Sequence, residues 1–185
     1  TVAVGGAHGA RRDEVMRVQV RQTIRKHLDK ELTVQGMKPG ERLKVLSLFF
    51  LDRVANFVGD EPKVRRWFDE EYETLRRDAR YLPLGLPEAD SVRAHYFAST
   101  PKKGGGEEFK DTSGQTKADD GAYELIMRDK VRLLSLDEPV RFIFSHSALR
   151  EGWDNPNVFQ ICTLNESRSE LKKRQEIGRG LRLPV

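Results

Sequence analysis

The feature that most restricts the fold of this chain is a nearly unbroken apolar run at residues 43–50, LKVLSLFF. The run lacks the strict alternation of apolar and polar residues that marks a strand with one face in water. A run of this kind is typical of a parallel strand that is buried on both faces. It therefore predicts a sheet that is covered on each side.

Helical patterns alternate with such strands along most of the chain. Apolar residues recur every four positions from Met16 to Leu32, which predicts a helix over residues 12–32 with Asp13 as its cap. Further helices are expected at 62–80, 123–134 and 169–180, and further strands at 91–97, 141–145 and 158–164. This order predicts an α/β layered fold with a mainly parallel central sheet flanked by helices.

Two changes in composition divide the chain. Glycines at positions 36 and 40 end the first helical pattern, so residues 1–40 are expected to form a helical segment that packs on a main body at 41–185. Residues 101–121 are rich in Gly, Lys and Asp and poor in apolar side chains. Such a segment cannot contribute to a core, and we expect it to be a flexible insertion.

Length and composition narrow the class of protein. A chain of 185 residues fits one domain with a sizeable core, and 37% hydrophobic with 34% charged residues favours a soluble, globular protein. No apolar run approaches the roughly 18 residues that a membrane span needs. The sequence lacks an initial Met and ends directly after its most informative motif. We expect it to be a piece of a longer polypeptide.

Cysteine, histidine and charge exclude some sites and permit others. The single cysteine, Cys162, rules out an internal disulfide and a Cys-based metal cluster, and its apolar surroundings favour a place in the core. The four His residues show no metal-ligand spacing. The net charge of +4 is compatible with a polyanionic partner.

The loop after the strand at 141–145 is the first candidate site, because ligands of parallel sheets bind at the carboxyl ends of strands. Hydroxyls and main-chain amides at a strand end can hold a phosphate. Gly152 permits a close backbone approach, and Asp154 can accept a hydrogen bond from a sugar hydroxyl. Alternatively, Asp154 and Asn155 only form the turn before Pro156.

The second candidate site is residues 175–182, QEIGRGLR. Arg179 and Arg182 are three positions apart and share one face of a helix. Two glycines cost a helix about 1 kcal/mol each relative to Ala, which makes sense where another surface must approach closely. A solvated basic helix is the alternative, and it suffices for Lys172, Lys173 and Arg174.

These two sites together resemble a known pattern. Gln-x-x-Gly-Arg-x-x-Arg, following a Gly-x-Asp-x-Pro-x-Val turn, is similar to the last two motifs of superfamily-two helicases. The longer stretches FIFSHSALREGWDNPNVFQICTLNE, KVLSLFFLDRVANF and YELIMRDKVRLLS resemble the Res subunit of type III restriction endonucleases. The likeness covers most of residues 23–182.

The resemblance implies a RecA-like three-layer fold, the second of two lobes that bind ATP between them while the enzyme moves along double-stranded DNA. It implies that Arg179 and Arg182 are catalytic and stabilise charge on the transferring phosphoryl group. It assigns a nucleotide-binding role to Gly152, Asp154, Gln175 and Gly178, and a nucleic-acid-binding role to Ser145, His146, Ser147 and Arg150. His146 departs from the family pattern, in which Thr or another small polar residue is usual.

Parts of such a motor do not occur in this sequence. There is no Gly-x-x-x-x-Gly-Lys-Ser/Thr loop, and no acidic box that follows a strand and could hold Mg²⁺. The resemblance therefore implies that ATP and Mg²⁺ are bound mainly by the first lobe. We expect the chain to be part of an ATP-dependent restriction endonuclease and to be inactive when isolated from it. The resemblance also implies a modification methyltransferase subunit as partner and the prokaryotic cytoplasm as location.

Two other functions fit fewer of these features. Another superfamily-two DNA helicase or repair translocase would share the final motif but not the longer SHSALREGWDNPNVFQ stretch. A basic DNA-binding module without an ATPase role would need neither Asp154 nor the arginine pair.

Limited proteolysis tests the proposed insertion. Because residues 101–121 cannot bury enough apolar area to offset the entropy of ordering the chain, trypsin should cut first near Lys102, Lys103 or Lys110. Initial cleavage within residues 43–50 would contradict this outline of the fold.

Overall fold

A computed structural model of the chain describes residues 6–97, 99–101, 107–109, 124–146, 155 and 157–164. Its centre is a four-stranded sheet with the order β2-β5-β1-β6, in which every pair of neighbours is parallel. The strands are β1 (Leu46–Leu51), β2 (Arg93–Tyr96), β5 (Phe142–Ser145) and β6 (Val158–Leu164). The predicted α/β fold with a parallel sheet is confirmed.

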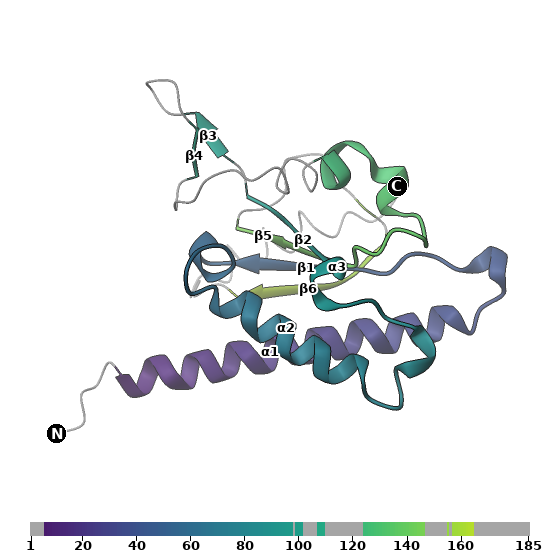
Figure 1. Ribbon diagram of the computed structural model, residues 1–185, viewed down its shortest axis with the longest axis horizontal. Helices are drawn as coiled ribbons and strands as arrows, with labels where there is room; N and C mark the ends of the chain where they lie inside the picture. Colours follow the sequence, from purple (N-terminus) through teal and green to yellow (C-terminus); the bar gives the residue numbers. More distant parts are fainter. Residues whose placement is uncertain are drawn as a thin grey trace.

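Helices lie on both sides of this sheet (Figure 1). The long helix α1 (Gly6–Gln35) and α2 (Lys63–Arg76) lie side by side along one face. The opposite face carries η4 (Glu124–Arg128), a π-helical turn, and α5 (Lys130–Leu133). The smaller elements are η1 (Pro39–Glu41), η2 (Val54–Asn56), η3 (Leu82–Leu84), α3 (Ala89–Val92), and the antiparallel pair β3 (Ser99–Pro101) and β4 (Glu107–Phe109).

Strand β1 is the most buried element, as the apolar run predicted. All six of its residues are buried, and it is hydrogen-bonded to β5 on one edge and to β6 on the other. Its side chains alternate between two cores: Phe49 packs toward α1 and α2, whereas Leu48 and Phe50 pack toward η4 and α5. The described chain is therefore built in three layers.

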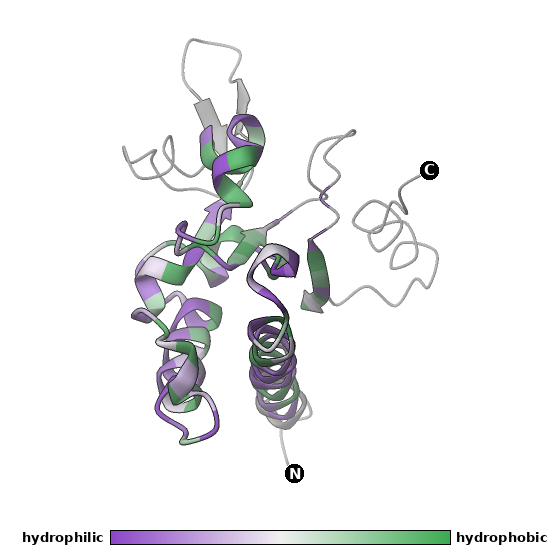
Figure 2. Cartoon of the chain, turned by 90° about the vertical axis from the view of Figure 1, so that its right-hand side faces the viewer, coloured by the Kyte–Doolittle hydropathy of each residue, from purple (hydrophilic) through white to green (hydrophobic). Residues whose placement is uncertain are grey.

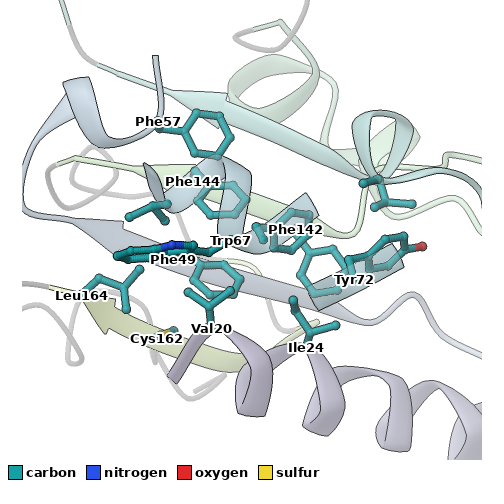
Figure 3. Close-up of a cluster of buried hydrophobic side chains, with 14 of the residues drawn as sticks. Val20, Ile24, Phe49, Phe57, Trp67, Tyr72, Phe142, Phe144, Cys162 and Leu164 are labelled. Atoms are coloured by element: carbon teal, nitrogen blue, oxygen red, sulfur yellow. The ribbon is translucent and has the colours of Figure 1, made fainter. Parts of the chain in front are cut away.

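Aromatic rings fill the core between the sheet and the α1–α2 layer. Phe49 stacks on Phe144 with ring centroids 4.7 Å apart, and Phe68 of α2 contacts Phe142 and Phe144 edge-on at 4.9 and 5.2 Å. Figure 3 shows Val20 of α1 approaching the same cluster. The hydropathy colouring in Figure 2 is mainly purple along α1 and α2, which agrees with helices that bury only one face.

The start of α1 differs from the sequence prediction. The helix begins at Gly6, so Asp13 lies within it and does not cap it. Its carboxylate instead accepts a hydrogen bond from Lys63 Nζ at 2.8 Å, near the start of α2. In the sequence, an acidic residue ahead of an apolar repeat looks like a helix cap. The actual partner of Asp13, Lys63, is 50 positions away, so the local sequence gives no sign of it.

Two arginines of α1, Arg17 and Arg21, connect the two helices of this layer. Arg17 Nε lies 2.7 Å from Glu71 Oε1, and Arg17 Nη2 lies 2.9 Å from Glu70 Oε2. Arg21 Nε lies 3.6 Å from Glu71 Oε2. Glu71 is buried, and hydrogen bonding to it raises the pKa of Arg17. Both arginines are exposed and also form ion pairs with α2.

Two further segments differ from the sequence prediction. The predicted helix at 123–134 is divided into η4 and α5, because Asp129 caps α5 by accepting a hydrogen bond from the Arg132 amide at 3.0 Å. Residues 107–109 pair as β4 with β3, although they fall in the expected insertion. The helix expected at 169–180 lies outside the described residues. No described helix is both long and apolar enough to cross a membrane.

His27 introduces a titratable group into the core between α1 and β1. It is fully buried; Nδ1 lies 2.7 Å from Ser47 Oγ, Nε2 lies 3.2 Å from Glu31 Oε1, and the ring lies 4.2 Å from that of Phe142. Burial lowers the pKa of His27, and the charges of Arg141 and Lys44 act in the same direction, whereas Glu31 opposes them.

Because the folded state binds this proton less tightly than the unfolded chain does, acid favours unfolding. The free energy of unfolding should decrease as pH falls from about 6.5, the unfolded pKa of His, toward 5. Denaturant titrations at pH 7 and pH 5 test this, with His27→Gln as the comparison because Gln carries no proton in this range. An equally steep loss of stability in the variant would contradict the assignment.

Candidate functional site at the carboxyl edge of the sheet

The carboxyl ends of the four strands meet at one edge of the sheet, at the left of the sheet in Figure 1. They end at Leu51, Tyr96, Ser145 and Leu164. In parallel sheets this is the edge where ligands bind. The first candidate loop of the sequence, which begins at Ser145, therefore leaves the sheet at the place where a binding site is expected.

Ser145 and His146 differ in their surroundings. Ser145 pairs in register with Phe50 of β1 and with Tyr96 of β2 and has no exposed surface. His146 is the first residue beyond β5 and is partly exposed. At the described end of β5, a ligand could therefore contact the His146 imidazole but not the Ser145 hydroxyl.

His146 connects the end of β5 to the end of β1. Its Nε2 lies 3.0 Å from the main-chain carbonyl oxygen of Asp52. Because a carbonyl oxygen only accepts hydrogen bonds, Nε2 must carry the proton. In the neutral ring this leaves Nδ1 as an acceptor, and in the protonated ring both nitrogens donate.

Asp52 connects this edge to the helices beside it. Its carboxylate accepts a hydrogen bond from Asn56 Nδ2 at 2.5 Å and forms an ion pair with Arg12 NH2 of α1 at 3.3 Å. The Arg12 side chain is 42% exposed, so the ion pair is worth at most about 1 kcal/mol. The ion pair matters for geometry, because Asp52 connects the end of β1 with Arg12 of α1 and with His146 after β5.

The structure describes only two of the residues that the sequence predicts for the site. Ser145 and His146 lie together at the carboxyl edge. The other predicted residues fall outside the described ranges; these are Ser147, Arg150, Gly152, Asp154, Gln175, Gly178, Arg179 and Arg182. Their roles stay predictions.

The turn before β6 is described in part. Asn155 Oδ1 accepts a hydrogen bond from the Asn157 amide at 3.0 Å, which is the local side-chain contact of an Asx turn. The Asn157 carbonyl oxygen accepts from the Leu46 amide at 2.8 Å, at the first residue of β1. Asn155 thus has the turn-forming role that the sequence offered as the alternative to ligand binding, whereas Asp154 is untested.

Asp52 and Arg12 were missed in the sequence analysis. Asp52 directly follows the apolar run of β1, so the rule that selected the residues after β5 also selects it. Arg12 has no comparable signal, because it precedes Asp52 by 40 positions and only the fold brings the two together. Among the described residues, no group of three or more His, Cys, Asp or Glu side chains is arranged to hold a metal ion.

The His146 contact can be tested through stability. His146→Ala removes a partly buried hydrogen bond and should lower the free energy of unfolding by about 1 kcal/mol. His146→Gln keeps an N–H donor at a similar distance from the main chain and should retain most of that stability. Equal losses in the two variants, measured by denaturant titration, would show that the bond to Asp52 contributes nothing.

The whole chain has recognisable relatives among known proteins. No family model matches it, and no solved structure gives a significant match. Three relatives are clearly similar in sequence. The chain is 42% identical over 181 residues to the Res subunit of the type III restriction-modification enzyme EcoPI of Escherichia phage P1, an alignment that includes 90% of this chain.

The other two relatives cover still more of the chain. Identity is 40% over 188 residues with the EcoP15I Res subunit of Escherichia coli and 35% over 211 residues with the StyLTI Res subunit of Salmonella typhimurium, with 94% and 98% of this chain aligned. The matched parts make up only 17–20% of these relatives. The chain is therefore homologous to a segment of the Res subunits of type III restriction-modification enzymes, and it spans about a sixth to a fifth of their length.

Proposed function

We propose that this chain is the second RecA-like lobe of the ATP-dependent DNA translocase in a type III restriction enzyme. The observation that carries the proposal is the similarity to three Res subunits along 90–98% of the chain. The parallel sheet with helices on both faces is the architecture that such a lobe requires. A division into a helical segment at 1–40 and a lobe at 41–185 is part of the same proposal.

ATP is the proposed substrate, bound between this lobe and a first lobe of the same polypeptide. Arg179 and Arg182 would reach across that cleft to the triphosphate, and Gln175 and Gly178 belong to the same motif. A guanidinium presents a planar fork of donors that matches phosphate oxygens. Its charge stabilises the negative charge that develops as the phosphoryl group transfers.

The nucleotide sugar and the metal ion complete the proposed ATP site. Gly152 and Asp154 would lie against the ribose, where the Gly lets the backbone approach and the carboxylate accepts from a hydroxyl. Mg²⁺ is assigned mainly to the first lobe, because no Asp-Glu box that follows a strand, of the kind that holds the metal ion, occurs in this sequence. The arginines alone form no phosphate cradle, so the isolated chain should not hydrolyse ATP.

Double-stranded DNA is the proposed track, and the carboxyl edge of the sheet is its proposed contact. His146 is partly exposed there, and its Nδ1 is the ring atom directed away from the Asp52 bond. Ser145, Ser147 and Arg150 belong to the same proposed contact. A modification methyltransferase subunit is the further partner that a Res subunit would have.

A basic DNA-binding module without an ATPase role is the competing function, supported by the net charge of +4. The two functions differ in what they require of the last motif. A motor needs Arg179 and Arg182 at their particular positions, whereas a basic surface needs only the sum of its charges.

Substitution of the arginines in the full-length parent enzyme separates the two functions. Arginines that reach across such a cleft contribute about 10³ to 10⁵ in rate, or roughly 4 to 7 kcal/mol. Arg179→Ala and Arg182→Ala should each lower DNA-stimulated ATP hydrolysis by at least about an order of magnitude, while nucleotide affinity changes far less. Replacement by Lys should restore little, because an ammonium lacks the planar fork.

Lys172→Ala and Lys173→Ala are the matched controls, since they remove the same charge from the same segment but lie outside the motif. Near-normal ATP hydrolysis in both lysine variants would support the motor. Equal damage from the lysine and arginine variants would mean that the segment acts only as a basic surface.

A further inference from the structure

A cavity of about 180 Å³ lies at the opposite, amino-terminal edge of the sheet. It is bounded by the last turns of α1, the residues that lead into β1, and Arg141 just before β5. Figure 1 shows that α1 runs against the direction of the strands, so its end and their beginnings come together. Its charged lining residues are Glu31, Arg42, Lys44 and Arg141, and its apolar ones include Val34 and Leu84.

Positive charge exceeds negative charge in this lining. Three cationic side chains, Arg42, Lys44 and Arg141, face a single carboxylate, Glu31. That carboxylate already accepts a hydrogen bond from Arg141 Nε at 2.8 Å, and its Oε1 lies 3.2 Å from His27 Nε2. It therefore compensates Arg141 and leaves the other two cations without an ion-pair partner in the cavity.

Lys44 is the cation for which this matters, because it is only 3% exposed. Its Nζ donates a hydrogen bond to the main-chain carbonyl oxygen of Glu138. The Glu138 carboxylate is engaged elsewhere, accepting from Arg132 Nε at 2.8 Å. In the described part of the chain, no carboxylate lies within ion-pair distance of Lys44.

A buried ammonium group without a counter-ion is costly, and buried charges in proteins are normally paired. Burial lowers the pKa of Lys44 to about 8; the charge of Arg141 acts in the same direction, whereas Glu31, Glu138 and Asp137 oppose the shift from a distance. A group with this pKa is still mainly charged at neutral pH. The cavity therefore contains a charge that no carboxylate of the described residues contacts directly.

We propose that this cavity binds a small oxyanion, with the Lys44 ammonium and the Arg42 and Arg141 guanidinium groups as its cationic wall. The site goes beyond the proposed motor function, and it lies at the edge of the sheet opposite to the one proposed for nucleotide and DNA. The anion supplies the charge that Lys44 lacks, and it joins the end of α1 to the starts of β1 and β5.

The size of the cavity restricts the ligand. A cavity of about 150 Å³ admits a benzene molecule, so about 180 Å³ accepts a phosphate or sulfate ion or a single carboxylate group. Arg42 is exposed and gives the cavity a charged mouth, whereas Leu84 and Val34 form apolar parts of its wall. Free phosphate and an acidic side chain from elsewhere in the parent protein are two sources of the same chemistry.

Thermal unfolding of the 185-residue chain provides the test, at pH 7 in a buffer without oxyanions. Phosphate at about ten times its dissociation constant should raise the unfolding midpoint by roughly 3–6 °C relative to sodium chloride of equal ionic strength. Acetate is the second probe. A shift with acetate as well as phosphate indicates a carboxylate source, and a shift with phosphate alone indicates a tetrahedral anion.

Three variants locate the effect. Lys44→Met and Arg42→Gln should each abolish most of the phosphate-induced shift in the unfolding midpoint. If replacing the buried Lys44 disturbs folding, Arg42→Gln still tests the site, because Arg42 is exposed. Lys38→Met removes the same charge from an exposed position outside the cavity and should keep the full shift. Phosphate should also raise the pKa of Lys44 from about 8 in NMR titrations of its side chain.

The proposal is overturned if neither anion shifts the midpoint more than sodium chloride does. It is also overturned if Lys44→Met and Lys38→Met respond alike, or if the pKa of Lys44 stays unchanged while the midpoint moves, since the anion would then bind elsewhere.

Discussion

The burial of strand β1 on both faces and both edges is the constraint on which the described structure depends. Leu48 and Phe50 contribute to the core beneath η4 and α5, Phe49 contributes to the core shared with α1 and α2, and β5 and β6 satisfy its two edges. Its one polar residue, Ser47, is fully buried and bonded to His27 of α1. A strand in this position needs helices on both sides, because either face alone would leave large apolar side chains in water.

The two ends of β1 lie at opposite edges of the sheet, and these two edges differ in their chemistry. At its carboxyl end, Asp52 receives the His146 hydrogen bond and the Arg12 ion pair, so the loop after β5 is attached to the central strand and to α1. At its amino end, Lys44 is buried with no carboxylate partner among the described residues. In the proposed motor, nucleotide and DNA act at the first edge, and an anion bound at the second edge would stabilise the layers that support it.

Local sequence patterns predicted the elements of the fold better than their contacts. The apolar runs at 43–50 and 158–164 corresponded to β1 and β6. Two-sided burial explains the continuous run of β1, whereas β6 lies at the edge of the sheet and is only partly buried. Asp13 was misread as a cap, since its partner on α2 lies 50 positions away. The ion pair between Arg17 and Glu71 likewise has no local signal in the sequence. For the site, the strand-end rule found His146, whereas the ion pair between Arg12 and Asp52 exists only through the fold.

The most direct measurement for the central claim is photo-crosslinking of an azido-ATP analogue to the full-length parent enzyme, followed by peptide mapping. If this lobe forms one wall of the ATP cleft, label should appear on the peptide that contains Arg179 and Arg182, and excess ATP should prevent it. Label confined to other regions of the enzyme, together with crosslinking of residues 175–182 to DNA, would contradict the account and show that the segment is a DNA-binding surface.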